Sequence, residues 1–190
     1  MRVLRTRGLS VKVDFSFLLF NAVVFMMRDG GDVFAFYTAC AVHEAGHIIT
    51  AHLLGVAIKR VELSGFGMIM TAEKQPLMPI TRSIAISAAG PAVNLLIFAV
   101  MSIAGRSGTF MTLNLAAAMY NLLPYDTLDG GAIISMLCEG RPNECVFRRC
   151  HTALKVGISV TLLILAAVWS REVLPLFVLS LILLLTDVKR

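Results

Sequence analysis

The residues whose types and spacing could do chemistry form the run His43-Glu44-Ala45-Gly46-His47. On an α-helix, two histidines four residues apart project from one face about 40° from each other, so both imidazoles can reach one metal ion. A glutamate beside such a pair can act as the general base of a zinc hydrolase. A helix with incidental polar residues is the alternative, but three ionisable groups in an apolar run are costly unless they are paired, metal-bound or face a cavity. The zinc site is therefore the favoured interpretation.

The composition is that of an integral membrane protein. The 190 residues are 57% hydrophobic and only 15% charged, and the mean hydropathy is +0.81, which excludes an ordinary soluble domain. The net charge of +5 comes from basic residues at the ends of apolar runs, so it indicates orientation in a lipid bilayer and not nucleic-acid binding. The first apolar stretch has no small-residue cleavage site, so we expect it to be retained in a single domain, residues 1–190.

The predicted fold is an all-α polytopic membrane protein with about six transmembrane helices and a small β element at the membrane edge. The β element is expected at 59–81, where apolar and polar residues alternate around a Gly-Phe-Gly sequence. The fourth span is broken at 121–131 by a proline, two carboxylates and a glycine pair, which cannot face lipid. The first and last spans are short and need tilt to cross. The predicted spans are 15–27, 33–58, 80–104, 110–137, 153–169 and 173–186.

The basic residues predict the orientation of these spans. With both termini in the cytoplasm, of the 17 lysines and arginines only Arg28, Arg106 and Arg171 fall on the outer side. This imbalance follows the positive-inside rule. It also requires the two short spans to cross, because the sidedness of every later loop would otherwise invert. We therefore expect a multi-pass protein of a bacterial inner or plasma membrane.

A catalytic zinc takes three protein ligands, so a third must join the two histidines. His52 lies about 140° round the helix from His47, which excludes it from the same ion and suggests an interfacial position. Asp129 lies at the same predicted depth as His47, about eight residues before the inner end of its span, but Asp126 is near enough to compete. The remaining candidates have weaker support, since the cysteine spacing matches no common structural zinc pattern; they are Glu62, His151, Cys40, Cys138, Cys145 and Cys150.

Three elements together resemble the site-2 protease family of intramembrane zinc metalloproteases. Their order matches, and about eighty residues separate the first from the last. The resemblance covers 33–137, which we expect to be the catalytic core, and it is greatest to the compact branch that includes the sporulation-type proteases. The elements are His43-Glu44-Ala45-Gly46-His47, Ala89-Gly90-Pro91-Ala92-Val93-Asn94, and Asn121-Leu122-Leu123-Pro124 running to Leu128-Asp129-Gly130-Gly131.

The resemblance assigns a role to each candidate residue. It implies that one Zn²⁺ is bound by His43, His47 and Asp129, which favours Asp129 over Asp126. It implies that Glu44 is the catalytic base. It also implies that Asn94 and Asn121 face the substrate and stabilise the oxyanion, with a hydrogen bond between membrane helices as the alternative for both. The Gly65–Gly67 region resembles the family's membrane-edge β element, which pairs with an extended substrate.

The function implied by the resemblance is hydrolysis of a peptide bond within or beside a transmembrane segment. Its expected partner is a membrane-anchored protein, such as a transcription regulator or its anchor, together with a regulatory membrane partner. A membrane metal transporter or zinc sensor could use the same ligands. Such a protein would have no need of Glu44, which favours the protease. A catalytically inactive relative is disfavoured because no ligand or base is missing from the sequence.

Overall fold

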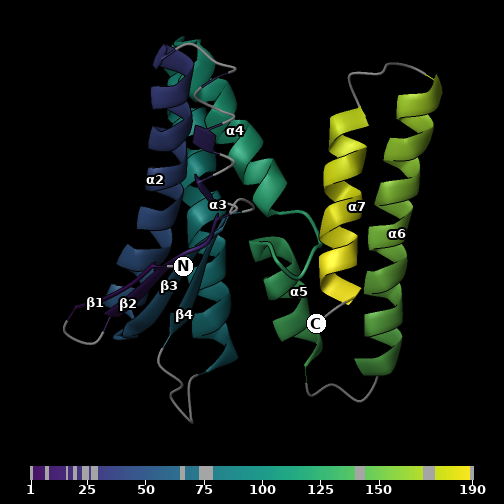
Figure 1. Ribbon diagram of the computed structural model, residues 1–190, viewed down its shortest axis with the longest axis horizontal. Helices are drawn as coiled ribbons and strands as arrows, with labels where there is room; N and C mark the ends of the chain where they lie inside the picture. The colour runs from purple at the N-terminus through teal and green to yellow at the C-terminus, as the bar shows by residue number, and fades with distance from the viewer. Residues whose placement is uncertain are drawn as a thin grey trace. The chain divides into compact units, whose positions relative to one another are not determined.

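The computed structural model describes residues 2–6, 9–15, 17, 18, 21, 22, 26, 30–64, 67–72, 79–139, 144–168 and 174–188. These residues form four strands and six helices (Figure 1). The chain divides into two compact units, Met1–Ala118 and Met119–Arg190, and each is described in turn.

The first unit contains a four-stranded sheet in the order β1-β2-β3-β4, formed by β1 (Arg2–Thr6), β2 (Leu9–Val13), β3 (Ile58–Ser64) and β4 (Gly67–Ala72). β1 and β2 pair antiparallel, as do β3 and β4, whereas β2 and β3 are parallel. The predicted β element at 59–81 is confirmed by β3 and β4, although Gly65 and Phe66 lie outside the described residues. β1 and β2 were not predicted, because this basic segment is too short to carry a clear alternation.

Two whole helices and most of a third complete the first unit: α2 (Gly30–Leu53), α3 (Ile80–Ile103) and, up to Ala118, α4 (Thr109–Asn121). α2 and α3 lie side by side. Their backbones approach closely at Gly46, where an added Cβ would lie 2.9 Å from the carbonyl oxygen of Ala89. Only glycine permits this spacing, and it brings the histidine-bearing face of α2 against α3.

The second unit contains α5 (Asp129–Cys138), α6 (Glu144–Val168) and α7 (Leu174–Val188). α6 and α7 form an antiparallel pair, and a small apolar core lies among Tyr125, Leu128 and Leu183. The predicted break in the fourth span is confirmed, since α4 ends at Asn121 and α5 begins at Asp129. α6 begins well before the predicted position 153. The prediction began too late because the first turns of α6 are charged and have the composition of a loop.

The chain has the burial pattern expected in a membrane. Its buried side chains include His43, His47, Asn94, Asn114 and Lys155, while large apolar side chains such as those of Leu53 and Ile103 are 78% and 88% exposed. Lipid accepts apolar surface and penalises exposed polar groups, so this inverted distribution suits a bilayer.

The number of membrane spans stays a prediction. Within the described ranges, α3 alone has both the length and the hydropathy, a mean of 2.0, of a membrane-spanning helix. α4, α5 and α7 have 13, 10 and 15 residues, fewer than the roughly 20 that span a bilayer without adjustment. Much of the first predicted span, 15–27, lies outside the described residues.

Candidate metal centre

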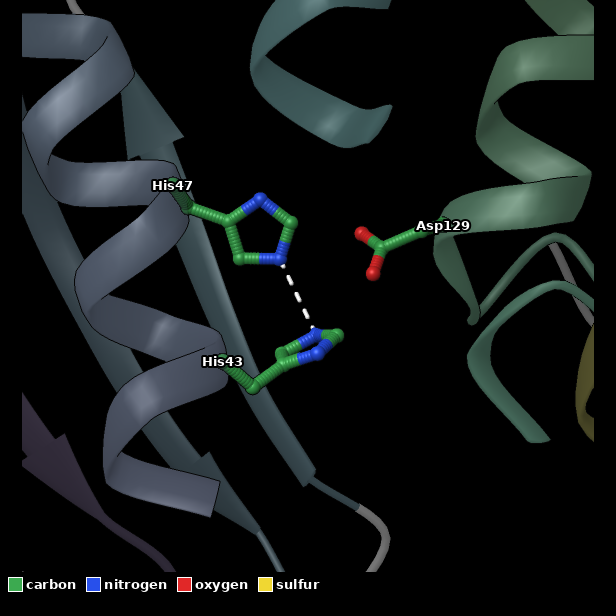
Figure 2. A group of neighbouring side chains, drawn as sticks. All are labelled: His43, His47 and Asp129. Atoms are coloured by element: carbon green, nitrogen blue, oxygen red, sulfur yellow. Dashed lines mark hydrogen bonds between the residues drawn. The ribbon is translucent and has the colours of Figure 1, made fainter. Parts of the chain in front are cut away.

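The two histidines of α2 converge as their spacing predicts. His43 and His47 are 5% and 6% exposed, and their rings meet edge to face with centroids 4.8 Å apart. Their Nε2 atoms are separated by 3.1 Å, the contact drawn as a dashed line in Figure 2. The α2 helix therefore presents both imidazoles to one point.

Hydrogen bonds at the Nδ1 atoms set the tautomer of each histidine. The Nδ1 atom of His47 donates to the carbonyl oxygen of Ile86, 2.7 Å away. The Nδ1 atom of His43 lies 2.7 Å from Oδ1 of Asn94. The amide nitrogen of Asn94 donates to Asn114 and Ala39, so its Oδ1 accepts the hydrogen of His43. Both Nδ1 atoms thus carry hydrogen, so in each neutral ring the lone pair is on Nε2.

The spacing of these Nε2 atoms fits a zinc ion. Two acceptor atoms 3.1 Å apart repel each other unless a cation lies against both. Zinc binds imidazole nitrogen at about 2.0–2.1 Å, which places two ligands of a tetrahedral ion about 3.3 Å apart. Asp129 belongs to the same group, because one ligand atom from each of His43, His47 and Asp129 lies within 4.8 Å of the others (Figure 2). Two imidazoles and a carboxylate are a common ligand set of catalytic zinc.

Gly90 gives the imidazoles the room they occupy. A Cβ added at this position of α3 would lie 2.3 Å from Nε2 of His47 and 2.7 Å from Nε2 of His43. No side chain fits there without moving both rings. The spatial reason for the Ala-Gly-Pro sequence is therefore a close approach of the α3 backbone to the histidines.

The loop before Asp129 folds tightly over the start of α5. A Cβ added at Gly130 would lie 2.3 Å from the carbonyl oxygen of Leu122, and one at Gly131 would lie 2.0 Å from that of Tyr125. The glycine pair that follows Asp129 thus lets the loop backbone pass against the first turn of α5. This non-helical passage holds Asp129 at the first position of its helix.

The competing ligand candidates lie in other environments. The carboxylate of Asp126 lies 2.8 Å from Nζ of Lys155 and 3.8 Å from Nδ1 of His151. His52 is exposed in the last turn of α2, and Glu62 pairs with Arg60 and Lys12 on the sheet. Three cysteines, Cys40, Cys138 and Cys150, carry free thiols, and no cysteine belongs to the metal-binding group found among the described residues.

The predicted polar residues lie in different environments. Asn94 is fully buried, and its side chain bonds to His43, Ala39 and Asn114, which are contacts between helices of the kind given as the alternative. A role of Asn94 toward a substrate stays a prediction. Asn114, also fully buried, was not predicted; its only sequence signal is an amide within an apolar helix. Glu44 follows His43 on α2, Asn121 is the last residue of α4, and both are half-buried.

Comparison with known proteins agrees with this site. No protein-family model matches the chain. A Synechocystis protein named as a zinc metalloprotease is 31% identical over 112 residues, 53% of this chain and 29% of that protein. Stage IV sporulation protein FB of Bacillus subtilis is 31% identical over 143 residues, 71% of this chain and 48% of that protein. The chain thus spans less than half the length of these two relatives.

The fold agrees with the sequence relatives. The site-2 protease from Methanocaldococcus jannaschii has a similar structure, with a TM-score of 0.68 over all of this chain and 94% of that one, at 21% sequence identity. The chain is therefore similar in sequence to zinc metalloproteases and in fold to a site-2 protease. Its exposed apolar side chains suit an integral membrane protein.

Proposed function

We propose that this chain is an intramembrane zinc metalloprotease that cleaves a peptide bond within or beside a transmembrane segment of its substrate. The observation that carries the proposal is the approach of the two Nε2 atoms to 3.1 Å, while both Nδ1 atoms are held by residues of α3. This arrangement suits a metal ion bound by both imidazoles. Asp129, the third member of the group, is proposed as the third ligand.

The proposed mechanism divides the chemistry among four residues of this chain. Zinc, when bound, polarises the scissile carbonyl and lowers the pKa of a water molecule toward about 7. Glu44 would take a proton from water and deliver it to the leaving amine. Asn94 holds the Nδ1 hydrogen of His43 and so would leave Nε2 available as the metal-binding atom. Asn121 is proposed to hydrogen-bond the substrate backbone or the oxyanion.

The proposed substrate is a membrane-anchored protein presented in an extended conformation. A helical peptide hides its scissile bond, whereas pairing with a sheet edge exposes it. β4 is the last strand in the sheet order, so it offers such an edge. The multi-pass topology with both termini in the cytoplasm belongs to the same proposal, as do a transcription regulator as substrate and a regulatory partner in the membrane.

The proposal is tested by comparing membrane proteomes of cells that make the wild-type chain or the Glu44→Gln variant. Wild type should generate cleaved fragments of at least one membrane protein that are absent with Glu44→Gln, while both proteins purify with one zinc per chain. Glu139→Gln, at an exposed position beyond the end of α5, is the matched control and should cleave like wild type. Equal cleavage by Glu44→Gln would refute the protease, and zinc transport that survives in this variant would favour the transporter.

A further inference from the structure

The second unit contains a cluster of buried polar groups that the proposed mechanism does not use. The cluster surrounds the tripeptide Pro124-Tyr125-Asp126, and its other members come from α6 and α7. We propose that these members form a clamp, made of His151, Lys155 and Asp187, whose function is to position Asp129. This inference rests on the proposed function of Asp129 as a metal ligand. It extends the part of the chain that the metal site requires beyond 33–137, to include α6 and α7.

Asp126 is held through both its side chain and its backbone. Nζ of Lys155 lies 2.8 Å from Oδ2 of Asp126 and 2.9 Å from Oδ2 of Asp187. The same Oδ2 atom of Asp187 accepts the backbone N–H of Asp126 at 3.0 Å. The side chains of Lys155 and Asp187 are only 6% and 5% exposed, whereas that of Asp126 is 38% exposed. The lysine thus joins α6, α7 and the loop, and its bond with Asp187 is buried, where charged hydrogen bonds are strong.

The two residues before Asp126 are held by the same helices. The carbonyl oxygen of Pro124 accepts a hydrogen bond from Nε2 of His151 at 2.7 Å. The hydroxyl of Tyr125 lies 2.6 Å from Oγ of Ser180 and 3.2 Å from Oγ of Ser159. Each residue of the tripeptide therefore has a partner on α6 or α7. A loop that only connected two helices would not need a bond at every position.

The position of the tripeptide is transmitted directly to the first turn of α5. The carbonyl oxygen of Tyr125 accepts a hydrogen bond from the N–H of Leu128 at 2.8 Å. The same oxygen is so close to Gly131 that a Cβ added there would lie only 2.0 Å from it. The backbones of the loop and of α5 are thus in contact on either side of Asp129. A shift of Tyr125 must move the start of α5, and with it the carboxylate of Asp129.

A clamp that positions a ligand and an ion pair that only stabilises the fold predict different results. Removing Lys155 alone leaves Asp187 without its cation and destabilises the protein in either case. Replacing both members by apolar residues removes the buried charge of each, which can restore stability. The loop would still have lost the lysine and the acceptor of the Asp126 amide. Zinc affinity in a stable double variant therefore separates the two roles.

The experiment uses the full chain in detergent micelles, with wild type, Lys155→Met and the double variant Lys155→Met/Asp187→Leu. Zinc affinity is measured by competition with a chelator, the geometry of the site by the visible spectrum of bound Co²⁺, and the loop by amide hydrogen exchange at 125–128. The double variant should unfold at a temperature near that of wild type, bind zinc about 10-fold more weakly, show an altered Co²⁺ spectrum and exchange the Asp126 amide faster.

Two further variants make the result interpretable. Thr161→Val, which removes a hydroxyl bonded only within α6 on its exposed side, is the control and should match wild type in every measurement. Asp126→Asn keeps the side-chain shape and should lower zinc affinity in the same direction but by less. Wild-type zinc affinity and exchange in both clamp variants would overturn the inference. Zinc affinity and amide exchange can be measured without proteolysis. If the clamp variants lower zinc affinity but the wild-type chain cleaves no protein, the proposed protease function is refuted and the clamp is not.

Discussion

Nδ1 of His43 on α2 lies 2.7 Å from Oδ1 of Asn94 on α3, and the amide nitrogen of Asn94 in turn donates to Asn114 on α4. One ligand of the candidate centre is therefore oriented by a relay that crosses three helices. The two asparagines are fully buried, so no water can replace the missing bonds if either amide is removed.

Replacing Asn94 by leucine should weaken zinc binding about 10- to 100-fold, the usual effect of removing a residue that orients a metal ligand. The physical reason is that His43 loses the acceptor that selects its tautomer. Chelator competition on the purified protein measures the change. Leu96→Ala, which changes a side chain of α3 that is 62% exposed, should bind zinc like wild type. An Asn94→Leu protein with unchanged affinity would show that Asn94 does not orient the ligand.

Replacing Gly90 by alanine should abolish stoichiometric zinc binding, because the new Cβ would lie 2.3 Å from Nε2 of His47. Metal analysis of the purified variant and its thermal unfolding measure this. Gly157→Ala is the matched control, since a Cβ there meets nothing within 4 Å, and alanine favours helix by about 0.5–1 kcal/mol. If Gly90→Ala keeps its zinc, the close approach of α3 does not define the site.

Asparagine at position 129 should lower zinc affinity far more than asparagine at position 126. Asp129→Asn removes a charged ligand from the proposed set, so we expect a loss of at least about 100-fold, or roughly 2.7 kcal/mol. Asp126→Asn weakens the contacts with Lys155 and His151 and leaves the three proposed ligands in place, so its loss should be smaller. Isothermal titration with zinc compares the two directly. The reverse order of effects would make Asp126 the ligand.

Zinc should stabilise the folded protein against heat. A ligand that binds only the native state, at about 100 times its Kd, adds about 2.7 kcal/mol to the free energy of unfolding. Unfolding followed with and without excess zinc should show a higher transition temperature in wild type and in Glu44→Gln. The double variant His43→Ala/His47→Ala should show no shift. An equal shift in that variant would place the zinc elsewhere.

The local features of the site could be predicted from the sequence, and the distant ones could not. The convergence of His43 and His47 follows from helical spacing, and the break before Asp129 follows from residues that lipid excludes. Depth could not separate Asp126 from Asp129, because they are three residues apart. What distinguishes them is Lys155, which contacts Asp126 from another helix, and no local pattern reveals that contact. The roles of Asn94 and Asn114 depend in the same way on how three helices pack.

The parallel pairing of β2 with β3 constrains the path of the chain through the membrane. An open sheet does not form within the hydrocarbon of a bilayer, so Val13 and Ile58, at the ends of these strands, lie on one side. If the chain between them enters the bilayer, it returns to the same side and so crosses an even number of times. If α2 crosses, one further crossing lies in the same segment. The unpredicted N-terminal strands thereby tie the sidedness of the histidine helix to that of the N-terminus.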